Sequence, residues 1–176
     1  KTWRAVPRPE FLSVVPRGDG GGNVLQVAVD KIEQDTPWGS GVSAAFASPV
    51  EAEDDDSARK LRVSIQARHI QGARFLNVGR PHGGSSRVTV RLGDEWQKTT
   101  FEVECDGRFA VPSLRFSLVG SRDGKRTEAG VFEIGDVEVY LLDDQGGVVG
   151  GNLLVNGSFG DGTATGWSAS YRVSED

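Results

Sequence analysis

Alternation of apolar and polar residues with a period of two recurs along this 176-residue chain, and it constrains the fold more than any other feature. Successive side chains of a β-strand point to opposite faces, so such runs are typical of strands that bury one face. The runs are NVLQVAV from residue 23, GVSAAF from 41, KLRVSIQAR from 60, RVTVRL from 87, TTFEVEC from 99, SLRFSLVG from 113 and VFEIGDVEVYLL from 131. Seven strands without a convincing helix predict an all-β fold, a two-sheet antiparallel β-sandwich.

The segments between these runs are rich in residues that favour turns. GDGGG begins at residue 18 and PHGG at residue 81, and the chain holds 24 Gly and 7 Pro but no Met. Glycine adopts positive φ at little cost and proline presets a bend, so these segments predict short turns between strands.

Charge and cysteine content exclude several classes of partner. The formal net charge is −5, whereas nucleic acids and anionic lipid surfaces require a basic face. No apolar run approaches the ~20 residues that span a bilayer. Cys105 is the single cysteine and His69 and His82 are the two histidines, so neither an internal disulfide nor an ordinary zinc site is expected. We therefore expect no nucleic-acid partner, no membrane partner and no metal ligands.

Several segments, taken in order, suggest a family. Between residues 38 and 143 the chain contains four such segments, namely WGSGVSAAFASPVEAEDDDSARKLRVSIQAR, GDEWQKTTFEVE, RFSLVG and VFEIGDVEVYLLD. This series resembles the β-jelly-roll carbohydrate-binding modules attached to bacterial xylanases and glucanases. The resemblance implies a jelly-roll sandwich, secreted or at the cell surface, that binds polysaccharide or oligosaccharide without catalysis. It also implies an appended catalytic domain, which the module holds at its glycan substrate.

The segment NLLVNGSFGDGTATGW, residues 152–167, resembles the N-terminal signature of the same modules but stands near the other end of this chain. We divide the chain into a module over residues 1–144, a Gly-rich connection over 145–151 and the signature over 152–176. The signature either completes the same sheet, in permuted order or by exchange between chains, or starts a second, truncated module. We expect Leu153, Val155 and Phe159 to be ordered and paired, in a monomer or a strand-exchanged dimer.

Sugars present C–H faces that pack on aromatic rings and hydroxyls that need planar polar side chains. Trp38 follows a proline and precedes small residues, so one face of its ring is expected to be open. Opposite the core faces of two predicted strands lie Gln66, Arg68, Glu138 and Tyr140, which would floor a groove if both strands share a sheet. An ordinary polar outer face, in a structural or protein-interacting spacer domain, is the alternative. Trp96 matches a family motif in which the ring packs against the sandwich.

A loop at residues 74–84, RFLNVGRPHGG, combines hydrogen-bonding groups with an aromatic ring. Its candidate binding residues are Phe75, Asn77, Arg80 and His82, and its arginines would suit uronic acid or sulfated sugars. Arginines in a loop can also serve only solubility.

The stretch EIGDVE, residues 133–138, holds three carboxylates, which is the chemistry that glycoside hydrolysis needs. Regular alternation places Asp136 and Glu138 on one face and Glu133 on the other. The stretch also matches the closing strand of the family, where the carboxylates are structural, so no enzymatic activity is expected.

The resemblance also implies a structural calcium ion, held in the family by a Glu and an Asp. This sequence has Gly160 and Gly135 at those two positions. Asp161, Asp136 and Asp19 could compensate, but calcium needs several oxygen ligands, usually with carboxylates among them. We therefore expect no cofactor, with calcium absent or weakly bound.

Overall fold

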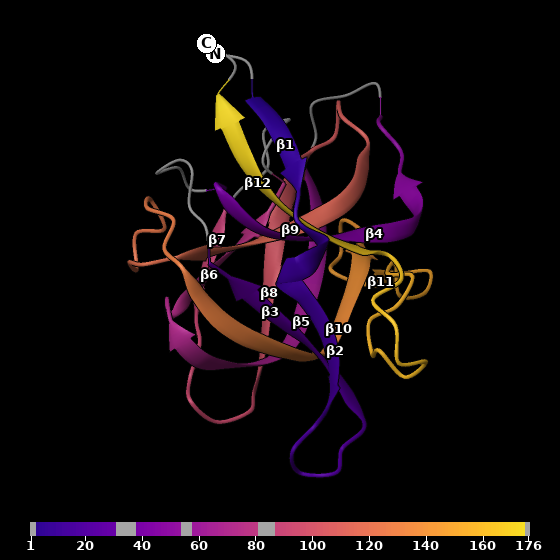
Figure 1. Ribbon diagram of the computed structural model, residues 1–176. Helices are drawn as coiled ribbons and strands as arrows, with labels where there is room; N and C mark the ends of the chain where they lie inside the picture. The colour runs from indigo at the N-terminus through magenta and orange to yellow at the C-terminus, as the bar shows by residue number, and fades with distance from the viewer. Residues whose placement is uncertain (1–2, 31–37, 54–57, 81–86, 175–176) are drawn as a thin grey trace.

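The computed structural model of the protein describes residues 3–30, 38–53, 58–80 and 87–174 (Figure 1). The one helical element in these segments is a short 3-10 turn, η1 (Pro9–Phe11). The strands are β1 (Trp3–Pro7), β2 (Leu12–Pro16), β3 (Asn23–Val29), β4 (Ser40–Val50), β5 (Ala58–Gly72), β6 (Phe75–Gly79), β7 (Val88–Arg91), β8 (Gln97–Asp106), β9 (Val111–Val119), β10 (Gly130–Leu142), β11 (Val148–Val149) and β12 (Trp167–Ser174). No helix in these segments has the length and apolar character to cross a bilayer.

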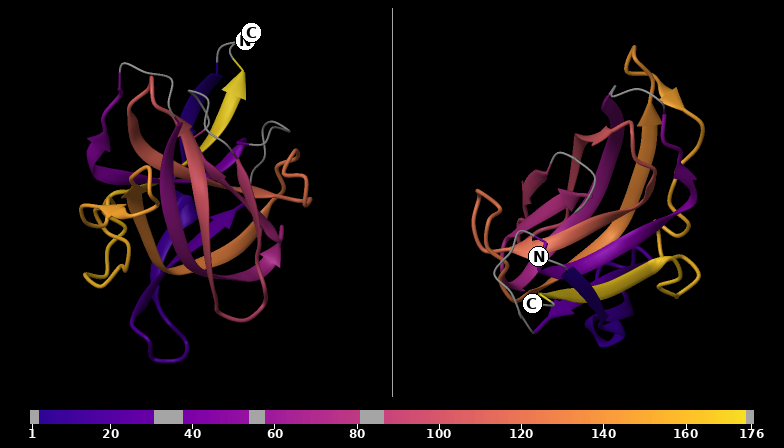
Figure 2. Two further views of the ribbon diagram at one scale, coloured as in Figure 1. Left: turned by 180° about the vertical axis from the view of Figure 1, so that it is seen from behind. Right: turned by 90° about the horizontal axis from the view of Figure 1, so that it is seen from above.

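The strands form two layers (Figure 2). Sheet A has the order β1-β12-β4-β9-β6-β7, and sheet B has the order β2-β3-β10-β5-β8 with β11 beside β10. Neighbouring strands in both sheets are antiparallel. The predicted all-β, two-sheet antiparallel sandwich is confirmed.

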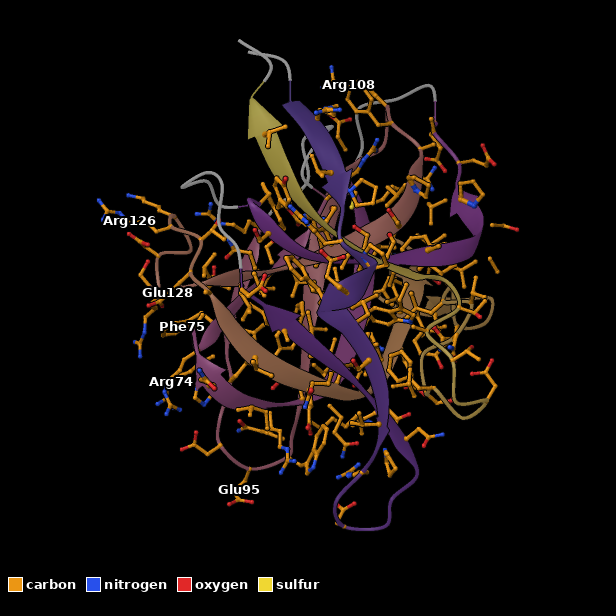
Figure 3. All side chains as sticks on the ribbon, in the orientation of Figure 1. Arg74, Phe75, Glu95, Arg108, Arg126 and Glu128 are labelled. Carbon is orange, nitrogen blue, oxygen red and sulfur yellow. The ribbon has the colours of Figure 1, made fainter. Side chains whose placement is uncertain are left out.

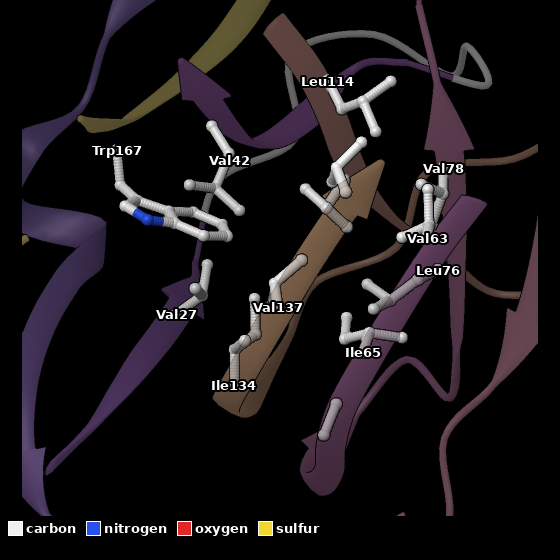
Figure 4. Close-up of a cluster of buried hydrophobic side chains, with 14 of the residues drawn as sticks. Val27, Val42, Val63, Ile65, Leu76, Val78, Leu114, Ile134, Val137 and Trp167 are labelled. Atoms are coloured by element: carbon white, nitrogen blue, oxygen red, sulfur yellow. The ribbon is translucent and has the colours of Figure 1, made fainter. Parts of the chain in front are cut away.

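The core lies between the sheets and is built from the alternating apolar residues (Figure 4). On β5 the inward residues Leu61, Val63 and Ile65 are almost fully buried, while the residues between them are half-buried. Sheet A contributes side chains such as Leu114 and Trp167 from the opposite side. Period-two alternation thus predicts correctly which face of β5 is buried.

The segment after residue 150 joins both sheets of the same chain. β12 lies between β1 and β4 in sheet A (Figure 1). Leu153 donates its N–H to the carbonyl of Val139 in sheet B, and its own carbonyl accepts the N–H of Ala47 in sheet A, both at 2.8 Å. Phe159 is fully buried and its ring centroid lies 5.3 Å from that of Trp167. This segment therefore bridges the two layers at one side of the sandwich.

Val155 behaves differently from its neighbours in this segment. Its N–H lies 3.4 Å from the carbonyl oxygen of Ala45, but its side chain is 50% exposed. The backbone of Val155 is thus paired with β4, whereas its side chain contributes little to the core.

A β-bulge in β10 changes which face its carboxylates occupy. The register shifts between Ile134 and Asp136, so that Glu133 lies opposite Arg68 and Asp136 lies opposite Gln66. A bulge inserts one extra residue and reverses the alternation beyond it. Glu133, Asp136 and Glu138 therefore share the outer face of sheet B, and the expectation that Glu133 lies on the other face was wrong.

Candidate functional site

The outer face of sheet A is covered around β9 and β6. Arg115 is 3% exposed and donates to the backbone carbonyl of Trp38 at 3.2 Å. Asn77 is fully buried, and its amide donates to the carbonyl of Gly124 at 2.7 Å. Because Trp38 and Gly124 lie over these strands, the polar side chains of Arg115 and Asn77 are not open to a polymer.

The outer face of sheet B, in contrast, is open and polar. Its side chains form three rows, and each row takes one residue from β8, one from β5 and one from β10. In that strand order the first row is Lys98, Gln66 and Asp136, the second is Thr100, Ser64 and Glu138, and the third is Glu102, Arg62 and Tyr140. A depression of about 250 Å³ lies over the first two rows and is lined by Ser64, Gln66, Lys98, Asp136 and Glu138. Amide, hydroxyl, ammonium and carboxylate groups thus face one shallow hollow, which suits a ligand rich in hydroxyl groups.

Trp96 borders this depression. The guanidinium carbons of Arg17 and Arg68 lie 4.3 Å and 5.1 Å from the centroid of its ring, a cation–π arrangement. Arg17 also donates to Oε1 of Gln66 at 3.0 Å. A Cβ at Gly135 would lie 3.3 Å from Cζ3 of Trp96, so the ring packs directly on the β10 backbone. These contacts fix the positions of Trp96, Arg17 and Gln66 relative to one another.

The carboxylates that β10 contributes to this face fall into two groups. Arg68 donates to Glu133 at 3.0 Å, and the Glu133 side chain, 7% exposed, also accepts from Gln26 at 3.3 Å. The half-buried Arg68 thus neutralises the charge of the buried Glu133 carboxylate. The carboxylates of Asp136 and Glu138, by comparison, accept no hydrogen bond and form no ion pair with any group that the structure describes. These two carboxylates are therefore available to a ligand.

A larger hollow, of about 610 Å³, lies farther along β5 and β10 beside the turn that joins β10 to β11. Its lining includes Lys60, Glu102 and Val149. Asp143 stabilises the turn by accepting N–H groups of residues 145 and 147 at 2.9 Å and 2.8 Å. Glu102 belongs to the same row as Arg62 and Tyr140, so this row adjoins the larger hollow on one side and the depression beside Trp96 on the other.

The structure brings four predicted site residues together and separates the others. The outer face of sheet B carries the four together, as alternation predicts, namely Gln66, Arg68, Glu138 and Tyr140.

The other predicted residues that the structure describes belong to sheet A or to loops beside it. Trp38 is half-buried at the entrance to β4, Phe75 is half-buried on β6, and Arg80 donates to the carbonyl of Ala110. Asn77 is buried, as described above. His82 lies outside the described residues. The four described residues of this set do not form one groove with those of sheet B.

The binding residues predicted from the sequence do not include three residues of this face, namely Arg17, Trp96 and Asp136. Trp96 was assigned to structural packing, and it does pack on the sandwich, but on the outer face beside the depression. Asp136 could have been predicted as a binding residue, because it lies two residues before Glu138 and alternation places both on one face. Nothing in the sequence indicates that Arg17 reaches across two strands to Gln66.

The carboxylates proposed as replacement calcium ligands are engaged elsewhere or lie on the open face. Asp19 accepts from Arg17 at 2.9 Å, and Asp161 accepts the N–H of Thr163 at 2.9 Å. Within the described segments no three His, Cys, Asp or Glu side chains are grouped to hold a metal ion. The side chains present do not fit the calcium site that the resemblance implies.

Comparison with known structures relates this fold to a carbohydrate-binding module. The chain is similar to the apo form of the carbohydrate-binding module of PbXyn10C, a xylanase, with a TM-score of 0.53 and 14% sequence identity. The match covers 96% of this chain and 92% of that chain. No protein-family model matches the chain, and no match was found among curated proteins. The likeness concerns the fold of the whole sandwich.

Proposed function

We propose that this protein binds a polysaccharide or oligosaccharide, without catalysis, through the outer face of sheet B. The observation that carries the proposal is the contrast between the two outer faces. Sheet A is covered over β9 and β6, whereas sheet B presents Gln66, Asp136 and Glu138 around an open depression bordered by Trp96. The similarity to a xylanase carbohydrate-binding module supports the same class of ligand.

The arrangement suits a sugar chain chemically. Carboxylates and amides accept and donate in-plane hydrogen bonds to hydroxyl groups, while aromatic rings pack against C–H faces. Tyr140 is half-buried on the same face as Trp96, so aromatic groups border the depression on two sides. Two carboxylates, of Asp136 and Glu138, line the depression against one ammonium group, of Lys98, and this excess of negative charge would repel uronic acid and sulfated sugars. We therefore propose a neutral glycan.

As part of a secreted or cell-surface enzyme, such a module would hold an appended catalytic domain near its polymeric substrate. The module would raise the effective concentration of the catalytic domain at its substrate, and it would need no catalytic activity of its own to do so.

The proposal is tested by measuring binding to soluble xylans, β-glucans, mannans and acidic polysaccharides. We expect binding to at least one neutral polymer and weaker or no binding to the acidic ones. Tyr140→Ala and Gln66→Ala should each lower affinity by about tenfold, which corresponds to about 1.4 kcal/mol.

Phe109→Ala is a matched control. Phe109 is 45% exposed and lies beside Arg108, at the end of the molecule opposite Glu95 (Figure 3). We expect its replacement to leave affinity unchanged. Loss of binding in Trp38→Ala but not in Tyr140→Ala would place the glycan on sheet A instead. No binding to any polymer would favour a spacer or protein-interacting domain.

A further inference from the structure

His69 is a buried histidine at the end of β5 with an oxygen acceptor at each ring nitrogen. Its Nδ1 lies 3.0 Å from Oδ1 of Asp94, and its Nε2 lies 3.0 Å from the carbonyl oxygen of Gly72. The side chain is 8% exposed. Both neighbouring atoms are hydrogen-bond acceptors, so both ring nitrogens must donate for the two contacts to be favourable.

Only the imidazolium form can do this. A neutral imidazole has one N–H donor and one nitrogen lone pair. In either neutral tautomer, one lone pair would face an acceptor oxygen at hydrogen-bond distance, which is repulsive. The geometry around His69 is thus complementary to the protonated ring.

Asp94 belongs to the Trp96 loop, residues 92–96, which joins β7 to β8. Asp94 also accepts from Arg74 at 2.9 Å. Hydrogen bonds from His69 first, and then from Arg74, hold the pKa of Asp94 below its usual range, so this carboxylate is ionised at neutral pH. The loop is further tied by the N–H of His69, which donates to the carbonyl of Gly93 at 2.7 Å.

We propose that His69 is a positioning residue. In its protonated form it fastens the Trp96 loop through Asp94, and it thereby holds Trp96 and Arg17 at the edge of the depression. The second half of this inference, an effect on glycan affinity, rests on the proposed function. The proposal predicts that glycan binding weakens as the pH rises through the range, between about 5 and 8, in which histidine changes charge.

The charged groups around the ring are few. Asp94 comes from the Trp96 loop and Arg74 from the turn after β5. From β10 the residue paired with His69 is the uncharged Phe132. Arg68 and Glu133, on the other face of the sheet, are paired with each other. The Asp94 carboxylate is therefore the one charge in contact with the ring among the described residues.

Asp94→Asn separates the effect of pH from the effect of the hydrogen bond that holds the Trp96 loop to His69. An amide can donate to the lone pair of Nδ1 in a neutral imidazole whose Nε2 donates to the carbonyl of Gly72. This variant should lose its dependence on pH. It should hold the loop less firmly than the unmodified protein does, because His69 and Arg74 both contact Oδ1 of Asp94, and an N–H group at that position cannot accept from Arg74. Asp94→Ala removes the fastening at every pH. Glu95→Ala is the matched control, because Glu95 lies exposed in the same loop (Figure 3) and its side chain forms no hydrogen bond or ion pair with another described residue.

The first readout needs no glycan. Nitrogen-15 spectra at about pH 6, assigned with His82→Gln, should show His69 with both ring nitrogens protonated. Hydrogen exchange of the Trp96 loop should quicken in Asp94→Ala and, for the unmodified protein, between pH 6 and 8 after correction for intrinsic rates. A neutral His69 ring at pH 6 beneath a protected loop would overturn the proposal.

The second readout is affinity for the glycan found by the polymer panel. We expect affinity to fall about fivefold from pH 5 to pH 8, at the lower end of couplings between sites. The fall should persist in Glu95→Ala and vanish in Asp94→Asn. A pH-independent affinity in the unmodified protein would overturn the effect on binding. If no glycan binds, the proposed function fails, while the spectra and exchange still decide whether His69 fastens the loop.

Discussion

The ring of Trp96 packs on the backbone of Gly135, at the bulge of β10. A Cβ at this position would lie 3.3 Å from Cζ3 of Trp96 and 3.1 Å from Oε1 of Gln66. The glycine therefore admits the aromatic ring and the amide together, and it lies beside Asp136, whose carboxylate lines the depression. One small residue thus sets the shape of the open face.

Gly135→Ala should displace Trp96 and Gln66 rather than unfold the protein, because the neighbouring atoms belong to side chains that can shift. We expect a loss of about 1 kcal/mol in the free energy of unfolding, at the mild end of overpacking. Affinity for the glycan should fall at the same time. Urea denaturation and binding measurements check both effects. Gly151→Ala is the control, since a Cβ there would meet nothing within 4 Å; equal behaviour of the two variants would contradict the assigned contact.

Trp167→Ala and Val155→Ala test whether the segment after residue 150 belongs to this core. Trp167 is 7% exposed and stacks on Phe116 with 5.7 Å between ring centroids, whereas Val155 is 50% exposed. Truncation of a buried Trp costs about 3–5 kcal/mol. Replacement of an exposed side chain usually changes stability by less than about 0.5 kcal/mol.

Chemical denaturation should therefore separate these two variants widely. Deletion of residues 146–176 should prevent folding, because β12 lies between β1 and β4. A soluble deletion product as stable as the full chain would show that the segment is dispensable.

The sandwich could be predicted from the sequence because a strand that buries one face alternates apolar and polar residues. The inward residues of β5, such as Val63 and Ile65, were identified in this way, and so were outward ones such as Gln66. Alternation fails where the backbone departs from regular pairing. The bulge at Gly135 places Glu133 on the outer face. An isolated glycine inside a strand pattern is a signal of a bulge, but the prediction assumed regular alternation across it.

The candidate site was harder to predict because it depends on contacts between loops that are distant in sequence. Arg17 and Trp96 meet over β10 although 78 residues separate them, and only the fold brings them together. Asn77 is the reverse case, a residue that was predicted to bind sugar but is not accessible. Its amide looked suitable for a sugar, but an outward position on a covered sheet is buried, and sequence alternation cannot tell an open outer face from a covered one.

Cys105 should be unreactive in the folded protein. It lies on the inner face of β8, and burial raises the pKa of its thiol to about 11. Thiol reagents attack the thiolate, so labelling at pH 8 should be slow and should follow unfolding. Above about pH 8.5, where an exposed thiol ionises, the unfolded state loses its proton first, so stability should decline with rising pH.

Labelling rates in buffer and in urea, compared with a free cysteine peptide, test this prediction for Cys105. Rapid labelling of the native protein at pH 8 would show that the thiol is accessible through local opening of β8.

Arg115→Met tests the covered face of sheet A. The guanidinium donates to the carbonyls of Trp38 and Ser170 and to the hydroxyl groups of Ser43 and Ser170, and thereby ties β9 to β4, β12 and the segment before β4. Methionine approximates the length of the side chain but leaves these buried acceptors without their donor. Unsatisfied buried polar groups cost about 1–3 kcal/mol each, and we expect a total loss of about 2–4 kcal/mol in the free energy of unfolding.

Arg122→Met, at an exposed position in the β9–β10 loop, is the matched control for Arg115→Met and should change stability by less than about 0.5 kcal/mol. Since Arg115 lies on sheet A, the folded fraction of Arg115→Met should keep its glycan affinity, while Tyr140→Ala should lose affinity and keep stability. Urea denaturation and binding measured on the same preparations separate the two roles. A stable Arg115→Met variant that binds glycan more weakly would reverse the assignment of the faces, because it would make sheet A the surface that the sugar contacts.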